Sequence, residues 1–248
     1  MALDFNGTTS LLTNNIADLS NGGVDMTFVA WFLADTAGEL SSGILVCSPE
    51  TGLGWACRYN SDNIVHFRAN IWSATDGVWS FTASMGVWHS LSISYNRTGT
   101  AADPAIRLDF VDVVPTVVSR PVGIGVGAAG TGVAVGNTIN LNQTFNGAID
   151  YVQIFDRILT VQEQDSALRY PYSIRSGLRF APLMLSPTNL FDLSGNGFHA
   201  TASSTALALR SGPPAVPFWM MQQEDDEFVS AAAAVLIQRF RAMMNVGR

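Results

Sequence analysis

In FNGAIDYVQIFDRILTVQE, residues 145–163, the carboxylate of Asp150 lies between the apolar residues of IDYV. Asp150 could serve as the acid or the nucleophile in hydrolysis of a glycosidic bond. Retaining hydrolysis, however, needs two carboxyl groups about 5–5.5 Å apart. The places for a partner hold Ala148 and Gln153, and no acid lies two residues to either side of Asp150. We therefore expect that the chain is not an enzyme.

The alternation of this segment predicts instead a strand that closes a sheet. Its two faces would carry Ile149, Tyr151 and Gln153 on one side and Asp150, Val152 and Ile154 on the other. A carboxylate among apolar residues should accept hydrogen bonds from backbone amides or from an arginine.

The remaining polar candidates are histidines and short runs of oxygen-bearing residues. No Ser-His-Asp or Cys-His set is evident around His66, His89 or His199, and a structural hydrogen bond is expected for His89. Calcium takes six to eight oxygen ligands. A calcium site could use Asp192 and Asn196 of DLSGN together with Asp4. The favoured alternative is that these residues make turns by bonding their own backbone. No other cofactor is expected.

Three tryptophans, Trp55, Trp72 and Trp79, lie near predicted turns. Exposed rings at such places could stack on sugars and form a glycan-binding platform. The favoured alternative places them in the core or in a subunit interface. Two cysteines, Cys47 and Cys57, flank the turn-rich SPETGLGWA. A cross-strand disulfide is geometrically possible there, but two buried free thiols are favoured.

Short segments rich in Val, Ile, Phe, Trp and Ser recur along the chain, and several alternate apolar and polar residues as half-buried strands do. They are TFVAWFLA (27–34), GILVCS (43–48), GWACRYN (54–60), IVHFRAN (64–70), VWSFTAS (78–84), WHSLSISYN (88–96), AIRLDFVD (105–112), GVAVGN (132–137) and AIDYVQIF (148–155). This pattern predicts an all-β sandwich or barrel.

The Gly-dense stretch at 123–137 has no following helix and no GK[ST], so its glycines are expected to let the chain bend or pass close to a sheet. Thr160 and Glu163 have the spacing of a capping box and predict a short helix that ends before Pro171. Further short strands are expected after it, around a tight SGNG turn.

The composition changes near the C-terminus. A Pro-rich linker is predicted at 212–223, followed by an amphipathic helix at 224–248 with acidic residues at its start and arginines near its end. The apolar face of this helix would dock on a partner subunit or on the sandwich itself. That face consists of Phe228, Ala232, Leu236, Phe240 and Met244.

The charge is low and acidic. Charged residues make up 13% of the chain, the net charge is −7, and the basic residues are all arginine. Scattered arginines on an acidic chain argue against nucleic acid as a partner. The sequence begins without the pattern of a signal peptide and contains no apolar run long enough to span a membrane. We therefore expect no membrane partner.

Four segments together resemble the laminin-G-like, concanavalin A-like jelly rolls over about residues 2–170. They are similar to the family's opening strand, its second strand, its Trp-His strand, and its closing strand with a short helix: ALDFNGTTSLLT (2–13), MTFVAWFLA (26–34), GVWHSLSISYN (86–96) and FNGAIDYVQIFDRILTVQE (145–163). The resemblance implies a concanavalin A-like jelly-roll β-sandwich at 1–211, and carbohydrate or protein binding, sometimes with calcium.

One departure concerns FDLSGNGFHATAS at 191–203, which resembles a loop that normally precedes the first strand of this family. The segment 172–211 would then be a permuted end of the sandwich, or would complete a neighbouring copy's sheet. The chain also resembles, in style, jelly-roll appendages of phage virion proteins. We therefore expect a non-enzymatic virion protein, a capsid decoration or fibre-type subunit made in the host cytoplasm. It would form homo-oligomers, contact other virion proteins and adhere to cell-surface glycan. The alternative is a lectin-like module that binds carbohydrate, with or without calcium.

Overall fold

The computed structural model describes ten stretches of the chain: residues 2–8, 12–14, 25–48, 54–70, 72–96, 102–124, 132–138, 140–188, 190–202 and 207–214. Met1–Pro213 forms one compact unit. The predicted helix at 224–248, with Phe228, Ala232, Leu236, Phe240 and Met244, lies outside the described residues, as does the linker beyond 214.

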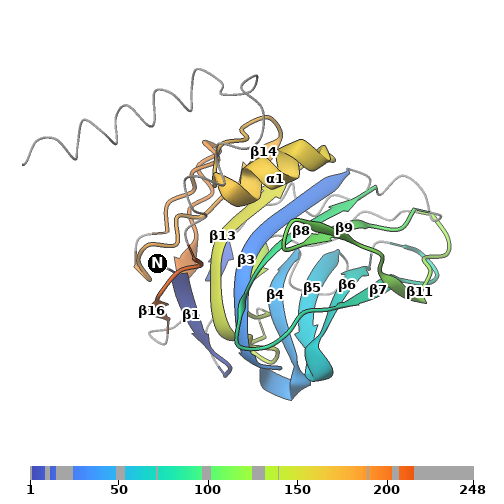
Figure 1. Ribbon diagram of the computed structural model, residues 1–248, viewed down its shortest axis with the longest axis horizontal. Coiled ribbons are helices and arrows are strands. Elements are labelled where there is room, and N and C mark those ends of the chain that lie inside the picture. The colour runs from blue at the N-terminus through green and yellow to red at the C-terminus, as the bar shows by residue number, and fades with distance from the viewer. Residues whose placement is uncertain are drawn as a thin grey trace, which may run out of the picture. The chain divides into compact units, whose positions relative to one another are not determined.

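Two antiparallel sheets form the body of the protein (Figure 1). The first sheet has the order β10 (Val111–Val113), β9 (Ala105–Leu108), β8 (Trp88–Tyr95), β3 (Met26–Thr36), β13 (Asn146–Phe155), β1 (Ala2–Asn6) and β16 (Ala208–Arg210), and β14 (Leu178–Phe180) also pairs with β13. The second sheet has the order β11 (Thr116–Ser119), β7 (Gly77–Thr82), β6 (Ile64–Ala69), β5 (Trp55–Asn60), β4 (Ser42–Ser48), β12 (Val133–Val135), β2 (Leu12–Asn14) and β15 (Thr201–Ala202). The predicted all-β sandwich is confirmed.

Inward-facing aromatic side chains fill the space between the sheets. The rings of Phe67 and Trp79 stack with centroids 6.0 Å apart, and Tyr95 of the first sheet lies 5.2 Å from Trp79. Such aromatic contacts add to the free energy gained by burying large apolar surfaces. The alternation of β5, β6 and β7 therefore sends one set of residues into this core and leaves the other set on the outer face.

The predicted strand at 105–112 is in fact a hairpin, because the chain turns at Asp109 and Phe110. Both residues have positive φ, 52° and 65°, which is uncommon outside glycine. The carboxylate of Asp109 holds the turn by accepting a hydrogen bond from the backbone amide of Ser90, at 2.9 Å. The strand β11 was not predicted.

The closing strand β13 contains a bulge, and the predicted grouping of Asp150 with Val152 and Ile154 on one face is therefore wrong. Asp150 pairs with Trp31 and Gln153 with Val29, so two residues on β13 lie opposite a single residue on β3. Tyr151 in this bulge has a φ of 52°. The bulge reverses the alternation, so Val152 and Ile154 point into the core with Ile149, whereas Asp150 points to the outer face.

The Gly-dense stretch passes close to a side chain of the first sheet, as expected from its composition. Gly136 has a φ of 79°, and a Cβ atom placed on it would lie 2.0 Å from the ring of Phe5. Glycine therefore lets the chain cross a packed aromatic ring at this point. Residues 125–131 of this stretch lie outside the described part of the chain.

The two cysteines are free and buried, which confirms the favoured interpretation. Cys47 pairs with Ala56, and Cys57 pairs with Val46, so the two thiols project from opposite faces of the second sheet. The cross-strand disulfide was wrong because it assumed that the cysteines lie directly opposite each other.

Two short strands near residue 210 complete the sheets within one chain. β16 pairs with β1, placing Leu209 opposite Leu3, and β15 pairs with β2. Arg210 of β16 contacts Asp4 at 3.4 Å and forms a two-pronged ion pair with Asp35. This ion-pair cluster ties the last described strand to the first.

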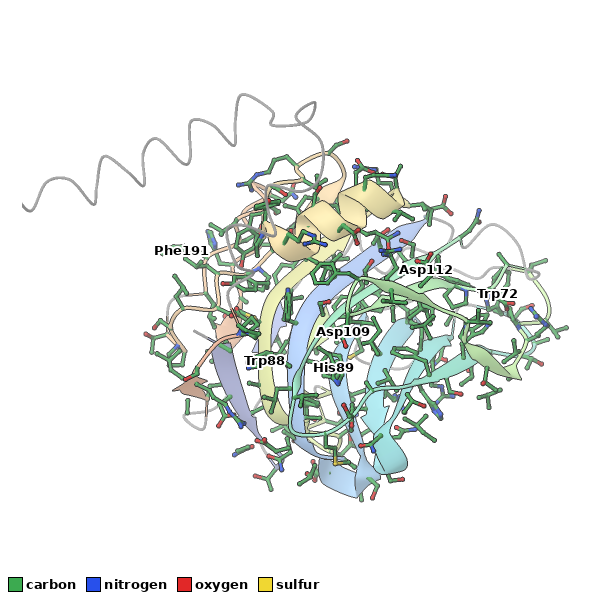
Figure 2. The ribbon with its side chains drawn as sticks, viewed as in Figure 1. Trp72, Trp88, His89, Asp109, Asp112 and Phe191 are labelled. Atoms are coloured by element: carbon green, nitrogen blue, oxygen red, sulfur yellow. The ribbon has the colours of Figure 1, made fainter. Side chains whose placement is uncertain are left out.

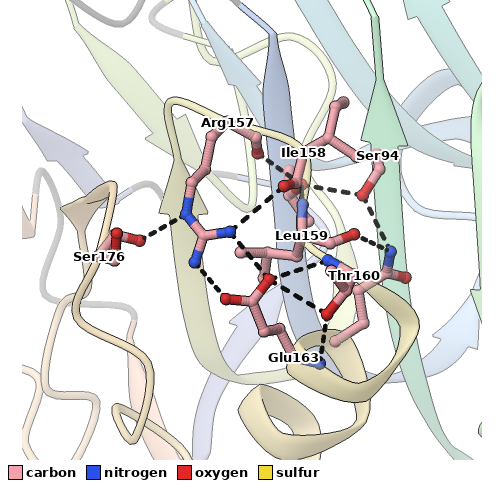
Figure 3. Close-up of polar contacts among 9 residues, drawn as sticks. Ser94, Arg157, Ile158, Leu159, Thr160, Glu163 and Ser176 are labelled. Atoms are coloured by element: carbon pink, nitrogen blue, oxygen red, sulfur yellow. Dashed lines mark hydrogen bonds and ion pairs between the residues drawn. The ribbon is translucent and has the colours of Figure 1, made fainter.

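The helix α1 (Val161–Arg169) begins with the predicted capping box (Figure 3). The backbone amide of Glu163 donates to the hydroxyl of Thr160 at 3.2 Å, and the amide of Thr160 donates to the Glu163 carboxylate at 2.9 Å. The Nη1 and Nη2 atoms of Arg157 donate hydrogen bonds to the same carboxylate at 2.8 and 2.6 Å. These bonds satisfy backbone groups that the first turn of a helix leaves unpaired.

Glu163→Gln should destabilise the fold by about 1 kcal/mol at neutral pH, because the capping hydrogen bond can remain while the Arg157 ion pair is lost. The Arg157 hydrogen bond lowers the pKa of Glu163 from 4.5 to about 2. The stabilisation is therefore present above pH 4.5 and is lost as the pH falls toward 2.

Urea unfolding of both proteins at several pH values tests this. Gln162→Ala, a change at an exposed position of the same helix, should leave the free energy of unfolding nearly unchanged. A wild-type advantage that persists unchanged at the lowest pH would contradict the assignment.

Candidate functional site

The outer face of the second sheet carries polar side chains in a row across neighbouring strands. Arg58 of β5 lies opposite His66 of β6, and His66 lies opposite Ser80 of β7. Arg68 lies one pleat further along β6, opposite Ala56. We call Arg58, His66 and Arg68 together the arginine–histidine face.

Arg58 is a half-buried cation without an ion-pair partner among the described residues. Its Nε atom is buried and makes no hydrogen bond, and its guanidinium forms no ion pair with any residue that the structure describes. Burial lowers the pKa of Arg58, and the charge of Arg68 lowers it further. Removing a charge from water without pairing it is unfavourable, so the fold holds this guanidinium at a free-energy cost.

The charge of Arg68 has one acidic neighbour among the described residues, Asp76, near the limit of ion-pair distance. Its Nη2 atom lies 3.9 Å from the Asp76 carboxylate, and its Nε atom is buried without a hydrogen bond. With Arg58, Arg68 and Asp76 counted together, one positive charge is left over. The arginine–histidine face is therefore locally cationic, although the chain as a whole carries a net charge of −7.

His66 is held neutral in a defined orientation. The side-chain amide nitrogen of Asn60 lies 2.9 Å from His66 Nδ1, and the Asn60 amide oxygen accepts from Ser42 Oγ at 3.0 Å. Burial lowers the pKa of His66, and both Arg68 and Arg58 lower it further. With Nδ1 accepting a hydrogen bond, the neutral ring carries its proton on Nε2, which can donate to a ligand.

Small side chains lie between the long ones. Ala56 lies opposite Arg68 and next to Arg58 on the same face of β5, and Ser80 lies opposite His66 on β7. Ala56 packs in a small apolar cluster on the outer face with Ile44, Cys47 and Ala134. All four residues of this cluster are buried, so the partly exposed part of this face includes Arg58, His66, Arg68 and Ser80.

This face was missed in the sequence, although a signal for it existed. GWACRYN and IVHFRAN alternate, and their polar positions hold Arg58, His66 and Arg68. A tight hairpin between these segments would have placed Arg58 opposite His66. The alternation of the sequence cannot show that Arg58 forms no ion pair with the residues that the structure describes.

The predicted glycan platform is wrong, because the three tryptophans point into the core. The exposed fractions of Trp55, Trp72 and Trp79 are 3%, 6% and 0%. Trp79 Nε1 donates to Asp103 at 2.7 Å, and Trp72 Nε1 lies 3.3 Å from the Tyr95 hydroxyl. The core alternative is confirmed.

The oxygens predicted for calcium are engaged within the protein. Asp192 accepts from the backbone amides of Ala181, Ser194 and Phe198, each at 3.0 Å. Asn196 donates to the carbonyls of Leu178 and Arg179, and Asp4 contacts Arg210. These bonds support the turn interpretation. No group of three or more His, Cys, Asp or Glu side chains suited to a metal occurs among the residues described.

Asp150 has only one of its expected partners. Its Oδ1 atom accepts a hydrogen bond from the backbone amide of Tyr151 at 2.9 Å, whereas its buried Oδ2 atom accepts none. Burial raises the pKa of Asp150 from 3.8 to about 7, against the opposing effect of the Tyr151 amide. The side chain is 1% exposed, so it is not open to a substrate.

Ser84, His89 and Asp109 lie in the order of a catalytic triad. His89 Nδ1 is 2.7 Å from Asp109, and Nε2 is 3.2 Å from Ser84 Oγ. However, Nε2 lies closer to the Ser84 carbonyl, at 3.0 Å. Burial disfavours the charged ring, but the Asp109 hydrogen bond and charge and the Ser84 carbonyl outweigh this and raise the pKa of His89.

A ring that donates from both nitrogens cannot take a proton from Ser84. His89 therefore connects two turns of the first sheet, which agrees with the expected structural hydrogen bond. Figure 2 shows His89 and Asp109 beside each other, near Trp88.

The sheets, their order and the closing helix define a lectin-type β-sandwich. The sequence matches the family described as the concanavalin A-like lectin/glucanases superfamily over residues 5–163. The chain belongs to this family, and the predicted jelly roll is confirmed. No curated protein matches the chain.

Solved structures show the same fold at low identity. A proposed carbohydrate-binding protein from Bacteroides ovatus ATCC 8483 has a TM-score of 0.61 and 11% identity, over 86% of this chain and 60% of its own. The chain thus spans less than two thirds of that protein. A heptameric SAP-like pentraxin from Limulus polyphemus has a TM-score of 0.51 and 13% identity, over 81% of this chain and 93% of its own. Domains LG4-5 of the mouse laminin α1 chain have a TM-score of 0.47 and 13% identity, over 86% and 47%.

Asp150→Asn should flatten the pH dependence of stability. Because the folded-state pKa is raised from 3.8 to about 7, the native state retains a proton that the unfolded chain has lost between these values. Stability therefore falls as pH rises through this window, by up to about 1.4 kcal/mol per pH unit. An amide in place of the carboxyl group cannot ionise. The free energy of unfolding of the variant should therefore increase relative to the wild type up to about pH 7, and the difference should stay constant above that pH.

Denaturant unfolding from acidic to mildly alkaline pH measures the effect. Asp156→Asn, which removes a carboxylate near Arg179 at the surface, should keep the wild-type slope. Equal slopes for wild type and Asp150→Asn would show that Asp150 ionises freely in the fold.

Arg58→Gln should stabilise the protein by roughly 0.5–1 kcal/mol, because it removes a partly buried cation that forms no ion pair with a described residue. It should also raise the pKa of His66 toward its ordinary value, since the charge of Arg58 is one of the groups that lower it. NMR titration of the imidazole and urea unfolding measure the two effects. Arg179→Gln, on the first sheet, should change neither. A destabilised variant with an unchanged His66 pKa would contradict the unpaired state of Arg58.

Proposed function

We propose that this chain is a carbohydrate-binding module and that it binds without catalysis. The observation that carries the proposal is the arginine–histidine face, where Arg58 and the Nε2–H of His66, on adjacent strands, have no hydrogen-bond acceptor among the described residues. Sugars offer many hydroxyl oxygens that accept such hydrogen bonds. Membership of a lectin and glucanase superfamily supports carbohydrate as the ligand class, as does the fold shared with a proposed carbohydrate-binding protein.

The absence of catalysis is part of the proposal. The outward residues of β5, β6 and β7 include no acid: they are Ala56, Arg58, Asn60, Ile64, His66, Arg68, Val78, Ser80 and Thr82. Glycoside hydrolysis normally needs two carboxyl groups across the bond that is cleaved. Asp150 is buried on the other sheet, where it lies opposite Trp31.

The virion role stays a prediction from the sequence, as does the homo-oligomer. They rest on the permuted end of the sandwich, the low charge and the helix predicted at 224–248, which lies outside the described residues. Calcium dependence is likewise a prediction. The helices among the described residues are all too short or too polar to cross a membrane.

A glycan array probed with the full chain tests the proposal. We expect binding of the wild type, and its loss in Ser80→Tyr, because a ring next to His66 would cover the adjoining part of the arginine–histidine face. Val114→Tyr is the matched control, since Val114 is 94% exposed between β10 and β11. Arrays run with calcium and with EDTA would test the predicted calcium dependence.

Failure to bind any glycan under either condition would overturn the proposal. So would binding that survives Ser80→Tyr in a folded protein. New reducing ends released from a bound polysaccharide would overturn the non-catalytic part.

A further inference from the structure

The arginine–histidine face presents hydrogen-bond donors almost exclusively. A guanidinium offers five N–H groups and no acceptor, and the neutral His66 ring presents its Nε2–H once Nδ1 is bound to Asn60. A neutral sugar hydroxyl can both donate and accept, so it does not require such a one-sided surface. A ligand group with acceptors only matches it better.

The charge of the face points the same way. Arg58 has no counterion among the described residues, and Arg68 has only Asp76 at 3.9 Å. A structural arginine would normally be paired or extended into water. Here the guanidinium of Arg58 is half-buried, and its Nε is enclosed without a bond. An anionic ligand would supply the missing charge and the missing acceptors together.

We propose that the arginine–histidine face binds a sugar bearing a singly charged acidic group, received between the guanidinium groups of Arg58 and Arg68. This inference rests on the proposed carbohydrate-binding function and specifies its ligand. One unbalanced positive charge on the face matches one negative charge on the ligand. A carboxylate of a uronic acid and a sulfate ester both have this charge and planar or trigonal sets of acceptor oxygens.

Each residue has a distinct part in the proposed complex. Arg58 and Arg68 bind the acidic group with charge-assisted hydrogen bonds, and His66 Nε2–H donates to an adjacent hydroxyl or ring oxygen. Asn60 is a positioning residue, because it fixes the His66 ring from the far side.

Calorimetric titration of the full chain tests the inference with three probes of similar length. The probes are hexagalacturonate for the carboxylate, a sulfated dextran oligosaccharide for the sulfate, and maltohexaose as the neutral sugar. We expect at least one acidic probe to bind about tenfold or more tightly than maltohexaose, and to weaken as salt screens the charges. The acidic probe that binds better identifies the source of the charge.

Variants locate the site. Arg58→Gln and Arg68→Gln should each weaken the acidic probe about tenfold, and the double variant should abolish the preference over maltohexaose. Arg179→Gln removes the same charge from the first sheet and should leave the affinity within about twofold. Bound acid should also raise the pKa of His66, because it offsets the two guanidinium charges.

The outcomes separate this inference from the proposed function. Binding of maltohexaose as tightly as of both acidic probes would overturn the inference and leave carbohydrate binding intact. Equal weakening by Arg179→Gln and by the face variants would also overturn it. Binding of no probe here and of no glycan on the array would overturn both. Circular dichroism and thermal melts confirm that each variant is folded.

Discussion

The strand register of the second sheet is the constraint on which both the core and the candidate site depend. In β5 and β6, Tyr59 pairs with Val65 and Cys57 with Phe67, all four pointing into the sandwich. The pleat then forces Arg58 and His66, between them, onto the outer face opposite each other. A slip of one residue would bury a guanidinium in the aromatic core. The packing that stabilises the fold therefore also fixes the geometry of the arginine–histidine face.

The two sheets bury unsatisfied polar groups for different reasons. On the first sheet, a bulge at Tyr151 turns Asp150 outward beneath covering chain, and its Oδ2 atom is left without a donor. Burial favours the neutral acid and therefore raises the pKa of Asp150. On the second sheet, Arg58 cannot relieve its position by losing a proton at ordinary pH. A persistent, unpaired cation is thus better explained by a ligand than by stability.

The sequence predicted regular elements well and local exceptions poorly. Period-two alternation located most strands, and the spacing of Thr160 and Glu163 predicted the capped helix. It could not show that Asp109, Phe110 and Tyr151 adopt positive φ, which turned one predicted strand into a hairpin and reversed the face of Asp150. Proximity to turns made Trp55 and Trp79 candidates for a glycan platform, but alternation within β5 and β7 decides which way they point, and it places them in the core as the favoured alternative predicted.

A crystal structure of the full chain with a bound acidic hexasaccharide would show directly whether the arginine–histidine face is the binding site. We expect one acidic group within hydrogen-bond distance of Arg58 and Arg68, and a hydroxyl or ring oxygen of the sugar near His66 Nε2. The same saccharide bound at the loops or on the first sheet, with the Arg58 guanidinium still unpaired, would contradict it.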